Sequence, residues 1–126
     1  MANSKILVID DDADIRSACR IVLEKAGYAV REAPTAGDGR RQIEKERPDL
    51  IILDIMMEES DAGIQLARWL AEKHAGLPVI MLSSIADAAE QTFDTSTLKV
   101  AELLNKPVAP QILLESVKRL LIRTGR

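Results

Sequence analysis

Cysteine, histidine and aromatic residues are scarce in this chain. Its 126 residues include one cysteine, Cys19, and one histidine, His74, and the aromatic fraction is 2%. A lone cysteine excludes a disulfide within the chain. Because aromatic rings are nearly absent, the core must be packed from aliphatic side chains. We expect Cys19 to lie in that core as an unreactive thiol, and His74 to be an exposed residue at a helix end.

Long apolar runs are also missing. No stretch has the length and composition of a signal peptide or a membrane-spanning segment, so we expect a cytoplasmic protein without membrane contact. The chain has 17 basic and 20 acidic residues and a formal net charge of -3, which argues against direct binding of nucleic acid. Its length fits a single domain over residues 1–126 and leaves no room for a second.

Short apolar runs and helical patterns alternate along the whole chain. The runs predict five strands, at residues 5–9, 28–32, 50–53, 79–82 and 100–104. The helical patterns predict five helices, at residues 14–26, 35–47, 64–73, 85–99 and 110–121. Gly27 should end the first helix, and the second should be weakly anchored because Ile43 is almost alone on its apolar face. This alternation predicts an α/β fold, a doubly wound five-stranded parallel sheet with helices on both faces.

Polar residues follow four of the predicted strands and should meet, because the carboxyl ends of parallel strands share one edge of the sheet. They are Asp10, Asp11 and Asp12 after the first strand, Asp54 after the third, Ser83 after the fourth and Lys106 after the last. Crowded carboxylates need a raised pKa or a bound cation. Oxygen ligands without cysteine or histidine favour Mg2+. A lysine and a hydroxyl beside such a cation suit phosphoryl transfer, with Asp54 attacking in line.

Four segments carry a resemblance to a known family. They are KILVIDDD at residues 5–12, DLIILDIMM at 49–57, VIMLSS at 79–84 and NKPV at 105–108. In this order and spacing they resemble the CheY-like receiver domains of bacterial two-component response regulators, over essentially the whole chain. The resemblance implies a flavodoxin-like sheet of strand order 2-1-3-4-5 with five helices. It implies a phosphorelay switch rather than a metabolic enzyme, phosphorylated on Asp54 by a histidine kinase or histidine phosphotransfer protein.

The resemblance also implies roles for individual residues at the predicted edge. Carried over by position, Asp11 would be a direct Mg2+ ligand, Asp10 would assist, often through water, and the main-chain carbonyl of Met56 would join Asp54 as a further ligand. Ser83 would be the switch hydroxyl and Lys106 the lysine that senses the phosphate, preceding a cis bond to Pro107. The last helix-strand-helix face would meet a downstream protein or output domain, or a second copy in a homodimer. No output domain is expected in this chain.

The sequence departs from the family's usual pattern beside Asp54. Glu58 stands where proline is common, and Ala62 resembles a one-residue insertion before Gly63. Leu103 takes the place of the usual aromatic switch residue, so signalling cannot use a ring flip. Met56 and Ile85 occupy two positions where polar side chains would orient hydrolytic water. We therefore expect slow loss of the phosphoryl group, which Met56→Asn or Ile85→Glu should accelerate.

Other functions fit the same residues less well. The alternating acids Asp10, Asp12 and Asp14 resemble a calcium loop, but Ile15 and Ile21 occupy its glycine and glutamate positions. Asp10 and Asp12 also fit a haloacid-dehalogenase-type phosphatase, but Asp14 does not, and no cap domain is present. A flavodoxin would need a phosphate-cradling loop instead of acids. A pseudo-receiver that binds partners without taking phosphate remains an alternative, prompted by the departures beside Asp54.

Overall fold

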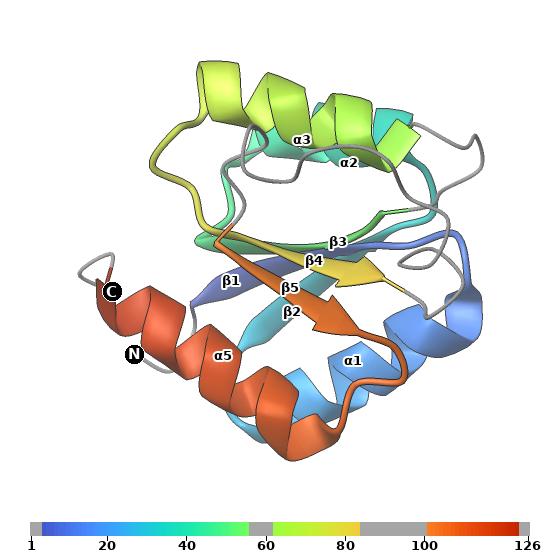
Figure 1. The fold of residues 1–126 in the computed structure, drawn as a ribbon, viewed down its shortest axis with the longest axis vertical. Helices are drawn as coiled ribbons and strands as arrows, with labels where there is room; N and C mark the ends of the chain where they lie inside the picture. The colour runs from blue at the N-terminus through green and yellow to red at the C-terminus, as the bar shows by residue number, and fades with distance from the viewer. Residues whose placement is uncertain (1–3, 56–61, 84–100, 124–126) are drawn as a thin grey trace.

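The computed structural model describes residues 4–55, 62–83 and 101–123, and its centre is a five-stranded parallel sheet (Figure 1). The strands are β1 (Lys5–Ile9), β2 (Ala29–Ala33), β3 (Leu50–Asp54), β4 (Val79–Ser83) and β5 (Glu102–Asn105). Their order across the sheet is β2-β1-β3-β4-β5, and every neighbouring pair is parallel. The predicted α/β class and the strand order implied by the resemblance are confirmed.

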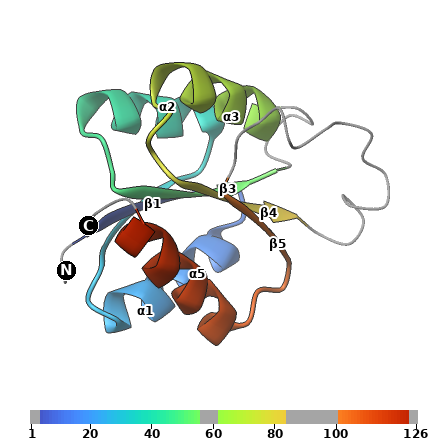
Figure 2. The same ribbon diagram turned by 60° about the vertical axis from the view of Figure 1, so that its left-hand side comes forward.

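Helices cover both faces of the sheet. The described helices are α1 (Ala13–Lys25), α2 (Ala36–Lys45), α3 (Ala62–Lys73) and α5 (Pro110–Arg123). Figures 1 and 2 show α1 and α5 on one face and α2 and α3 on the other. Four of the five predicted helices are therefore present, and the one expected at residues 85–99 lies outside the described residues. None of the described helices has the length and apolarity needed to span a bilayer.

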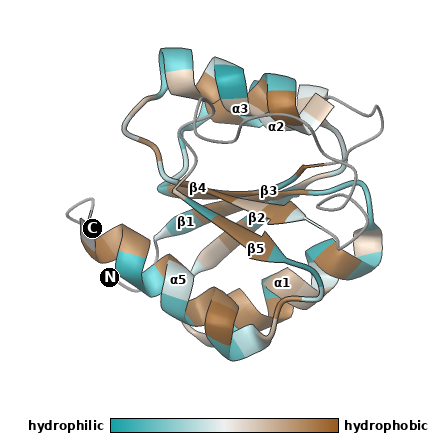
Figure 3. Cartoon of the chain, in the orientation of Figure 1, coloured by the Kyte–Doolittle hydropathy of each residue, from teal (hydrophilic) through white to brown (hydrophobic). Residues whose placement is uncertain are grey.

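The core consists of two aliphatic layers separated by the sheet. Leu7, Ile51 and Leu53 belong to the layer under α2 and α3, whereas Ile6 and Ile52 belong to the layer under α1 and α5. Successive residues of a strand point to opposite faces, so strands covered on both sides must be apolar throughout. Figure 3 shows this for the central strands β3 and β4, which are coloured mainly as hydrophobic, and all residues of these two strands are buried. All five residues of β3 are buried, which confirms the central strand predicted from its unbroken apolar run.

Local signals set the ends of α1. The side chain of Asp12 caps its first turn by accepting a hydrogen bond from the Asp14 amide at 2.9 Å. At the other end Gly27 adopts a positive φ of 101°, as expected of a helix terminator. The amides of Gly27 and Tyr28 donate to the carbonyls of Glu24 and Leu23, so the last turn keeps its hydrogen bonds. The chain is thereby turned back to start β2.

Two helices approach the sheet through glycine. On α2 the buried residues are Ile43, as predicted, and Gly39, where a Cβ atom would lie 2.6 Å from the Cδ1 of Ile9. On α3 a Cβ atom at Gly63 would lie 2.4 Å from the carbonyl oxygen of Asp54. Ala62 is the first residue of α3, so this helix begins two residues before its predicted start. The missing side chain at Gly63 brings α3 against the end of β3.

The prediction that His74 is exposed was wrong. His74 follows α3 and is half-buried, with its ring edge-on to Trp69 at a centroid distance of 5.1 Å. The guanidinium of Arg40, on α2, lies 4.5 Å from the centre of the Trp69 ring. Trp69 therefore packs between the two helices of this face. Cys19 is buried as predicted, and burial raises the pKa of its thiol to about 11.

Candidate functional site

The carboxyl edge of the sheet brings together residues that are far apart in the sequence. Asp10 directly follows β1, Asp54 ends β3, Ser83 ends β4 and Lys106 directly follows β5. Each is held there by strand pairing: the amide of Asp10 donates to the carbonyl of Ala33, and the amide of Lys106 donates to the carbonyl of Ser83. Met56, the remaining predicted ligand, lies outside the described residues. The polar edge predicted from the sequence thus exists as a geometric site.

Three carboxyl groups form the acidic part of the site. Asp10, Asp11 and Asp54 each contribute an oxygen atom, and these atoms lie within 4.8 Å of one another. Asp10 is 0% and Asp54 3% exposed, whereas Asp11 faces solvent. Burial raises the pKa of Asp10, against the opposing effects of the Asp12 amide and of Lys106. Two buried carboxylates this close are costly unless positive charge accompanies them.

Lys106 supplies one positive charge. Its Nζ atom lies 2.9 Å from Oδ1 of Asp54 and 3.4 Å from Oδ2 of Asp10. The side chain is 19% exposed, so burial alone would lower its pKa, but the hydrogen bond and charge of Asp54 outweigh burial and raise the pKa of Lys106. The lysine therefore stays protonated between the two acids. The bond between Lys106 and Pro107 is cis, as the resemblance implied.

One buried oxygen of Asp10 has no hydrogen-bond donor among the described residues. Oδ1 accepts from the Asp12 amide at 2.9 Å, but Oδ2 receives no hydrogen bond and has only the longer ionic contact with Lys106. A buried carboxylate oxygen without a donor costs roughly 1–3 kcal/mol. A cation that accepts oxygen ligands would remove this cost, and Mg2+ has that preference. The donor set therefore fits Mg2+, with Asp10, Asp11 and Asp54 as the described residues able to hold it.

Ser83 and Leu103 are the other described positions that the sequence singled out. Ser83 is 1% exposed and follows Leu82, which pairs with Asp54 in the register between β3 and β4. Leu103 is 39% exposed on β5 and pairs with Met81. An aliphatic residue thus occupies the surface position where the resemblance implies an aromatic ring. The predicted loop departure at Glu58 and the variable residue Ile85 lie outside the described part of the chain.

An apolar cavity of about 390 Å³ adjoins Lys106 between α1 and the start of α5. Its walls come from α1, β4 and the residues after β5: Ile15, Ala18, Cys19, Val22, Leu82, Lys106, Pro107, Val108, Pro110 and Leu113. Cys19 is therefore a wall residue of this cavity as well as a core residue. Lys106, which contacts Asp10 and Asp54, forms part of the cavity wall, and the lining is mostly apolar.

The residue that the sequence analysis missed is Arg16. It lies one helical turn after Asp12, and its Nη1 atom donates to the carbonyl oxygen of Asp10 at 2.7 Å. Its position four residues into a helix that starts at the acidic loop was the available signal. Its Nε atom also donates to Oε1 of Glu32, on β2, at 3.0 Å. Local spacing cannot predict this contact because it crosses from one element to another.

Comparison with known proteins decides what kind of domain carries this edge. The sequence model of one protein family, the response regulator receiver domain, matches residues 6–118 of this chain. The chain belongs to this receiver domain family. Receiver domains are signalling switches that act with histidine kinases and output domains and that generally bind Mg2+ at an acidic pocket, a description that suits the edge formed by Asp10, Asp11 and Asp54.

The chain is similar to parts of longer proteins of different kinds. The chain is 36% identical over 120 residues to transcriptional regulatory protein GltR of Pseudomonas aeruginosa, covering 94% of the chain and 49% of that protein. It is 37% identical to a protein-glutamate methylesterase/protein-glutamine glutaminase of Archaeoglobus fulgidus, covering 94% of the chain and 34% of that protein. The chain therefore spans about half or less of the length of these relatives.

A solved structure agrees with the whole receiver fold. The CheY-like response regulator receiver domain protein from Methanospirillum hungatei superposes with a TM-score of 0.85 at 29% identity. The match covers 98% of this chain and 97% of that one. This receiver domain thus shares its fold with a protein that has almost the same length.

Proposed function

We propose that this receiver domain is a phosphoacceptor that takes a phosphoryl group on Asp54 with Mg2+ bound. The described ligands would be Asp10, Asp11 and Asp54, and the main-chain carbonyl of Met56 would complete the protein's share. The main support for this proposal is the hydrogen bond from Nζ of Lys106 to Oδ1 of Asp54, at 2.9 Å. Next to it lies Oδ2 of Asp10, which is buried and accepts no hydrogen bond from the described residues. The site thus already contains the ammonium group of Lys106, and Oδ2 of Asp10 is available to bind a metal cation.

Asp54 is the group that would react. Its carboxylate oxygen would attack the phosphorus of a phosphohistidine on a histidine kinase or phosphotransfer protein, opposite the leaving imidazole. A phosphorus–oxygen bond forms, the phosphorus–nitrogen bond breaks, and the imidazole keeps the electron pair and takes up a proton. When bound, Mg2+ supplies positive charge that offsets the carboxylates and the phosphoryl oxygens.

Lys106 and Ser83 would respond to the new group. Lys106 is protonated and already contacts the oxygen of Asp54, so it is placed to pair with a phosphoryl oxygen instead. Ser83 would donate its hydroxyl proton to another phosphoryl oxygen. The hydrogen bond from the Lys106 amide to the Ser83 carbonyl links the ends of β4 and β5, at 2.7 Å. A shift of either residue is therefore passed to both strands.

The surface that changes would be formed by β5 and α5. Large apolar side chains are exposed there: Leu103 is 39%, Ile112 48% and Ile122 65% exposed. This surface would meet a downstream protein, an output domain or a second copy of the chain. Amide chemical shifts recorded with and without beryllofluoride test this part, and shifts confined to the acidic edge would contradict it.

The direct test uses a small phosphodonor and beryllofluoride. We expect Mg2+-dependent addition of one phosphoryl group, measured by intact mass, and Mg2+-dependent binding of beryllofluoride. Asp54→Asn is the matched control because it removes the attacking oxygen and keeps the shape of the side chain. Absence of any Mg2+-dependent response in the unsubstituted protein would favour the pseudo-receiver instead. Turnover of phosphomonoesters would favour the phosphatase.

A further inference from the structure

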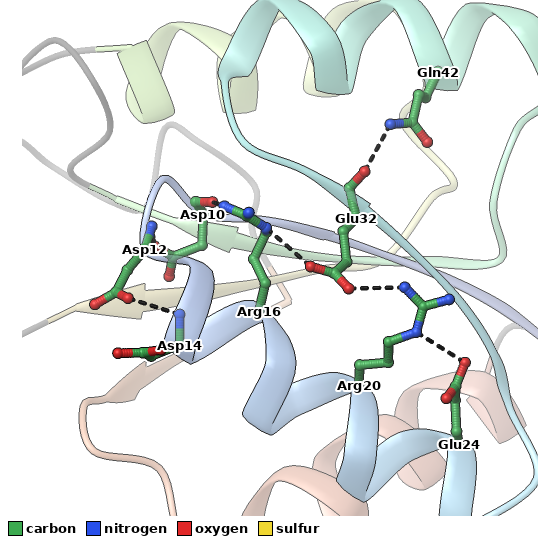
Figure 4. A network of polar contacts seen from close by, with 8 residues as sticks. All are labelled: Asp10, Asp12, Asp14, Arg16, Arg20, Glu24, Glu32 and Gln42. Carbon is green, nitrogen blue, oxygen red and sulfur yellow. Dashed lines mark hydrogen bonds and ion pairs between the residues drawn. The ribbon is translucent and has the colours of Figure 1, made fainter.

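Arg16 joins the acidic edge to the strand on the far side of β1. Its Nη1 atom donates to the carbonyl oxygen of Asp10 at 2.7 Å, and its Nε atom donates to Oε1 of Glu32 at 3.0 Å (Figure 4). The side chain is only 16% exposed. A guanidinium has donors in a rigid planar fork, so one side chain can hold both acceptors at a fixed separation. Arg16 thus ties the backbone of Asp10 to the side chain of Glu32.

The other polar groups of Asp10 are anchored as well. Its amide donates to the carbonyl of Ala33 at 3.1 Å, and its Oδ1 atom accepts from the amide of Asp12 at 2.9 Å. With the carbonyl held by Arg16, the remaining atom is Oδ2, which points at the site and receives no hydrogen bond from the described residues. The orientation of this carboxylate therefore depends on the backbone to which it is attached.

Glu32 is itself fixed. Its Oε2 atom accepts from Nη1 of Arg20 at 2.8 Å, and its carbonyl accepts from Nε2 of Gln42 at 2.8 Å. The hydrogen bond from Arg20, opposed by burial and reinforced by Arg16, lowers the pKa of Glu32, so the carboxylate is ionised. Its charge balances that of Arg16. The charge of Arg16 is thus used by Glu32 rather than by the carboxylates of Asp10, Asp11 and Asp54. The effect of Arg16 on these carboxylates comes from its hydrogen bond to the carbonyl of Asp10.

We propose that Arg16 is a positioning residue for the cation site, with Glu32 as its support. By holding the carbonyl of Asp10, Arg16 fixes the turn from Asp10 to Asp12, and so the direction of the carboxylates of Asp10 and Asp11. The inference rests on the proposed function insofar as Mg2+ is the cation. Groups one shell away from the ligands commonly change metal affinity by about 10–100-fold when they are removed.

Mg2+ affinity measured by isothermal titration calorimetry tests the proposal without requiring phosphorylation. We expect Arg16→Ala to weaken Mg2+ binding about 10-fold. Arg16→Lys should fall between Arg16→Ala and the unsubstituted protein, because one ammonium cannot bridge two acceptors as a planar fork does. Arg20→Ala is the matched control. Arg20 bonds Glu32 and Glu24 but not Asp10. Its loss weakens the support of Glu32 but leaves both hydrogen bonds of Arg16 in place, so Arg20→Ala should weaken Mg2+ binding clearly less than Arg16→Ala does.

A second readout separates positioning from general stability. Hydrogen exchange of the Asp12 amide, which donates to Oδ1 of Asp10, should accelerate in Arg16→Ala while exchange in the centre of β3 stays unchanged. Glu32→Gln should move both readouts in the same direction as Arg16→Ala, because it weakens the support but keeps the arginine. If Arg16→Ala does not fold, Arg16→Lys and Glu32→Gln carry the comparison.

The outcomes distinguish this inference from the proposed function. Unchanged Mg2+ affinity in the Arg16 and Glu32 variants, with normal binding by the unsubstituted protein, overturns the role of Arg16 alone. Equal weakening by Arg20→Ala also overturns it, because the effect would then come from the network's charge or stability. An unsubstituted protein that binds no Mg2+ overturns the proposed function and this inference together.

Discussion

Nζ of Lys106 lies 2.9 Å from Oδ1 of Asp54, across 52 positions of sequence. The contact exists because β5 lies next to β4 and β4 next to β3, so the residue after β5 reaches over one strand to the end of β3. It places a protonated amine between two buried acids. The stability of the cation-free protein should therefore depend on this lysine.

Replacement of Lys106 by methionine should destabilise the cation-free protein. The charged hydrogen bond to Asp54 is lost and Asp10 and Asp54 face each other without a counter-charge, so we expect a loss of about 1–3 kcal/mol in the free energy of unfolding. Urea denaturation measures it. Lys106→Arg is the control that keeps the charge. Added Mg2+ should restore part of the loss, and a methionine variant as stable as the unsubstituted protein would contradict the role of the ion pair.

Asp10→Asn should have opposite effects on stability and on cation binding. The variant removes a buried charge whose Oδ2 atom lacks a donor, so the cation-free protein should become more stable by roughly 1 kcal/mol. Mg2+ binding should weaken because a charged ligand is gone. Asp11→Asn is the comparison: Asp11 is exposed, so its replacement should weaken Mg2+ binding with little change in stability. A destabilised Asp10→Asn protein would show that Oδ2 is already satisfied.

The ion pair of Glu32 should give the protein an acid-dependent part of its stability. Hydrogen bonds from Arg20 lower the pKa of Glu32 below its usual 4.5, so the folded chain binds this proton less readily than the unfolded chain does. The stabilisation is present above pH 4.5 and is lost as the pH falls through the lower pKa of the folded state.

Glu32→Gln measures this contribution. Unfolding experiments at a series of pH values should show a difference between the two proteins that is constant near neutral pH and shrinks in acid. Arginine side chains in general stay charged in acid, so the pH-dependent change belongs to the carboxyl group. A difference that does not depend on pH would mean that Glu32 contributes through packing only.

Gly63→Ala should disturb both the fold and the site. A Cβ atom there would lie 2.4 Å from the carbonyl oxygen of Asp54 and 2.6 Å from that of Ile55, and both are backbone atoms that cannot move without shifting β3. We expect a loss of about 2–3 kcal/mol in unfolding free energy and, under the proposed function, slower phosphorylation of Asp54.

Gly37→Ala is the matched control for the Gly63 substitution. The added atom would meet Nη1 of Arg41 at 3.7 Å, which is an ordinary contact. Alanine in place of glycine in a helix stabilises by about 0.5–1 kcal/mol, so this variant should equal or exceed the unsubstituted protein. If Gly37→Ala and Gly63→Ala change the free energy of unfolding equally, the close approach of α3 to β3 is not the cause of the loss in Gly63→Ala.

Local patterns were sufficient for much of the fold. The unbroken apolar run before Asp54 predicted a strand buried on both faces, and Gly27 predicted the end of α1, because each depends on residues adjacent in sequence. The strand ends were less well predicted. β2 covers Ala29–Ala33 instead of 28–32, and β5 begins at Glu102 instead of residue 100, since pairing with neighbouring strands decides where a strand begins.

What the sequence determined by itself is the alternation of elements, and with it the gathering of Asp10, Asp54, Ser83 and Lys106 at one edge. Parallel strands leave no other place for residues that follow them. Only the tertiary structure decided how those groups are held. Three contacts join residues from different parts of the fold: the hydrogen bond from Arg16 to the Asp10 carbonyl, the ion pair of Arg16 with Glu32, and the packing of the half-buried His74 against Trp69. Residue spacing along the chain does not predict such contacts, because their geometry is set by how helices and strands pack.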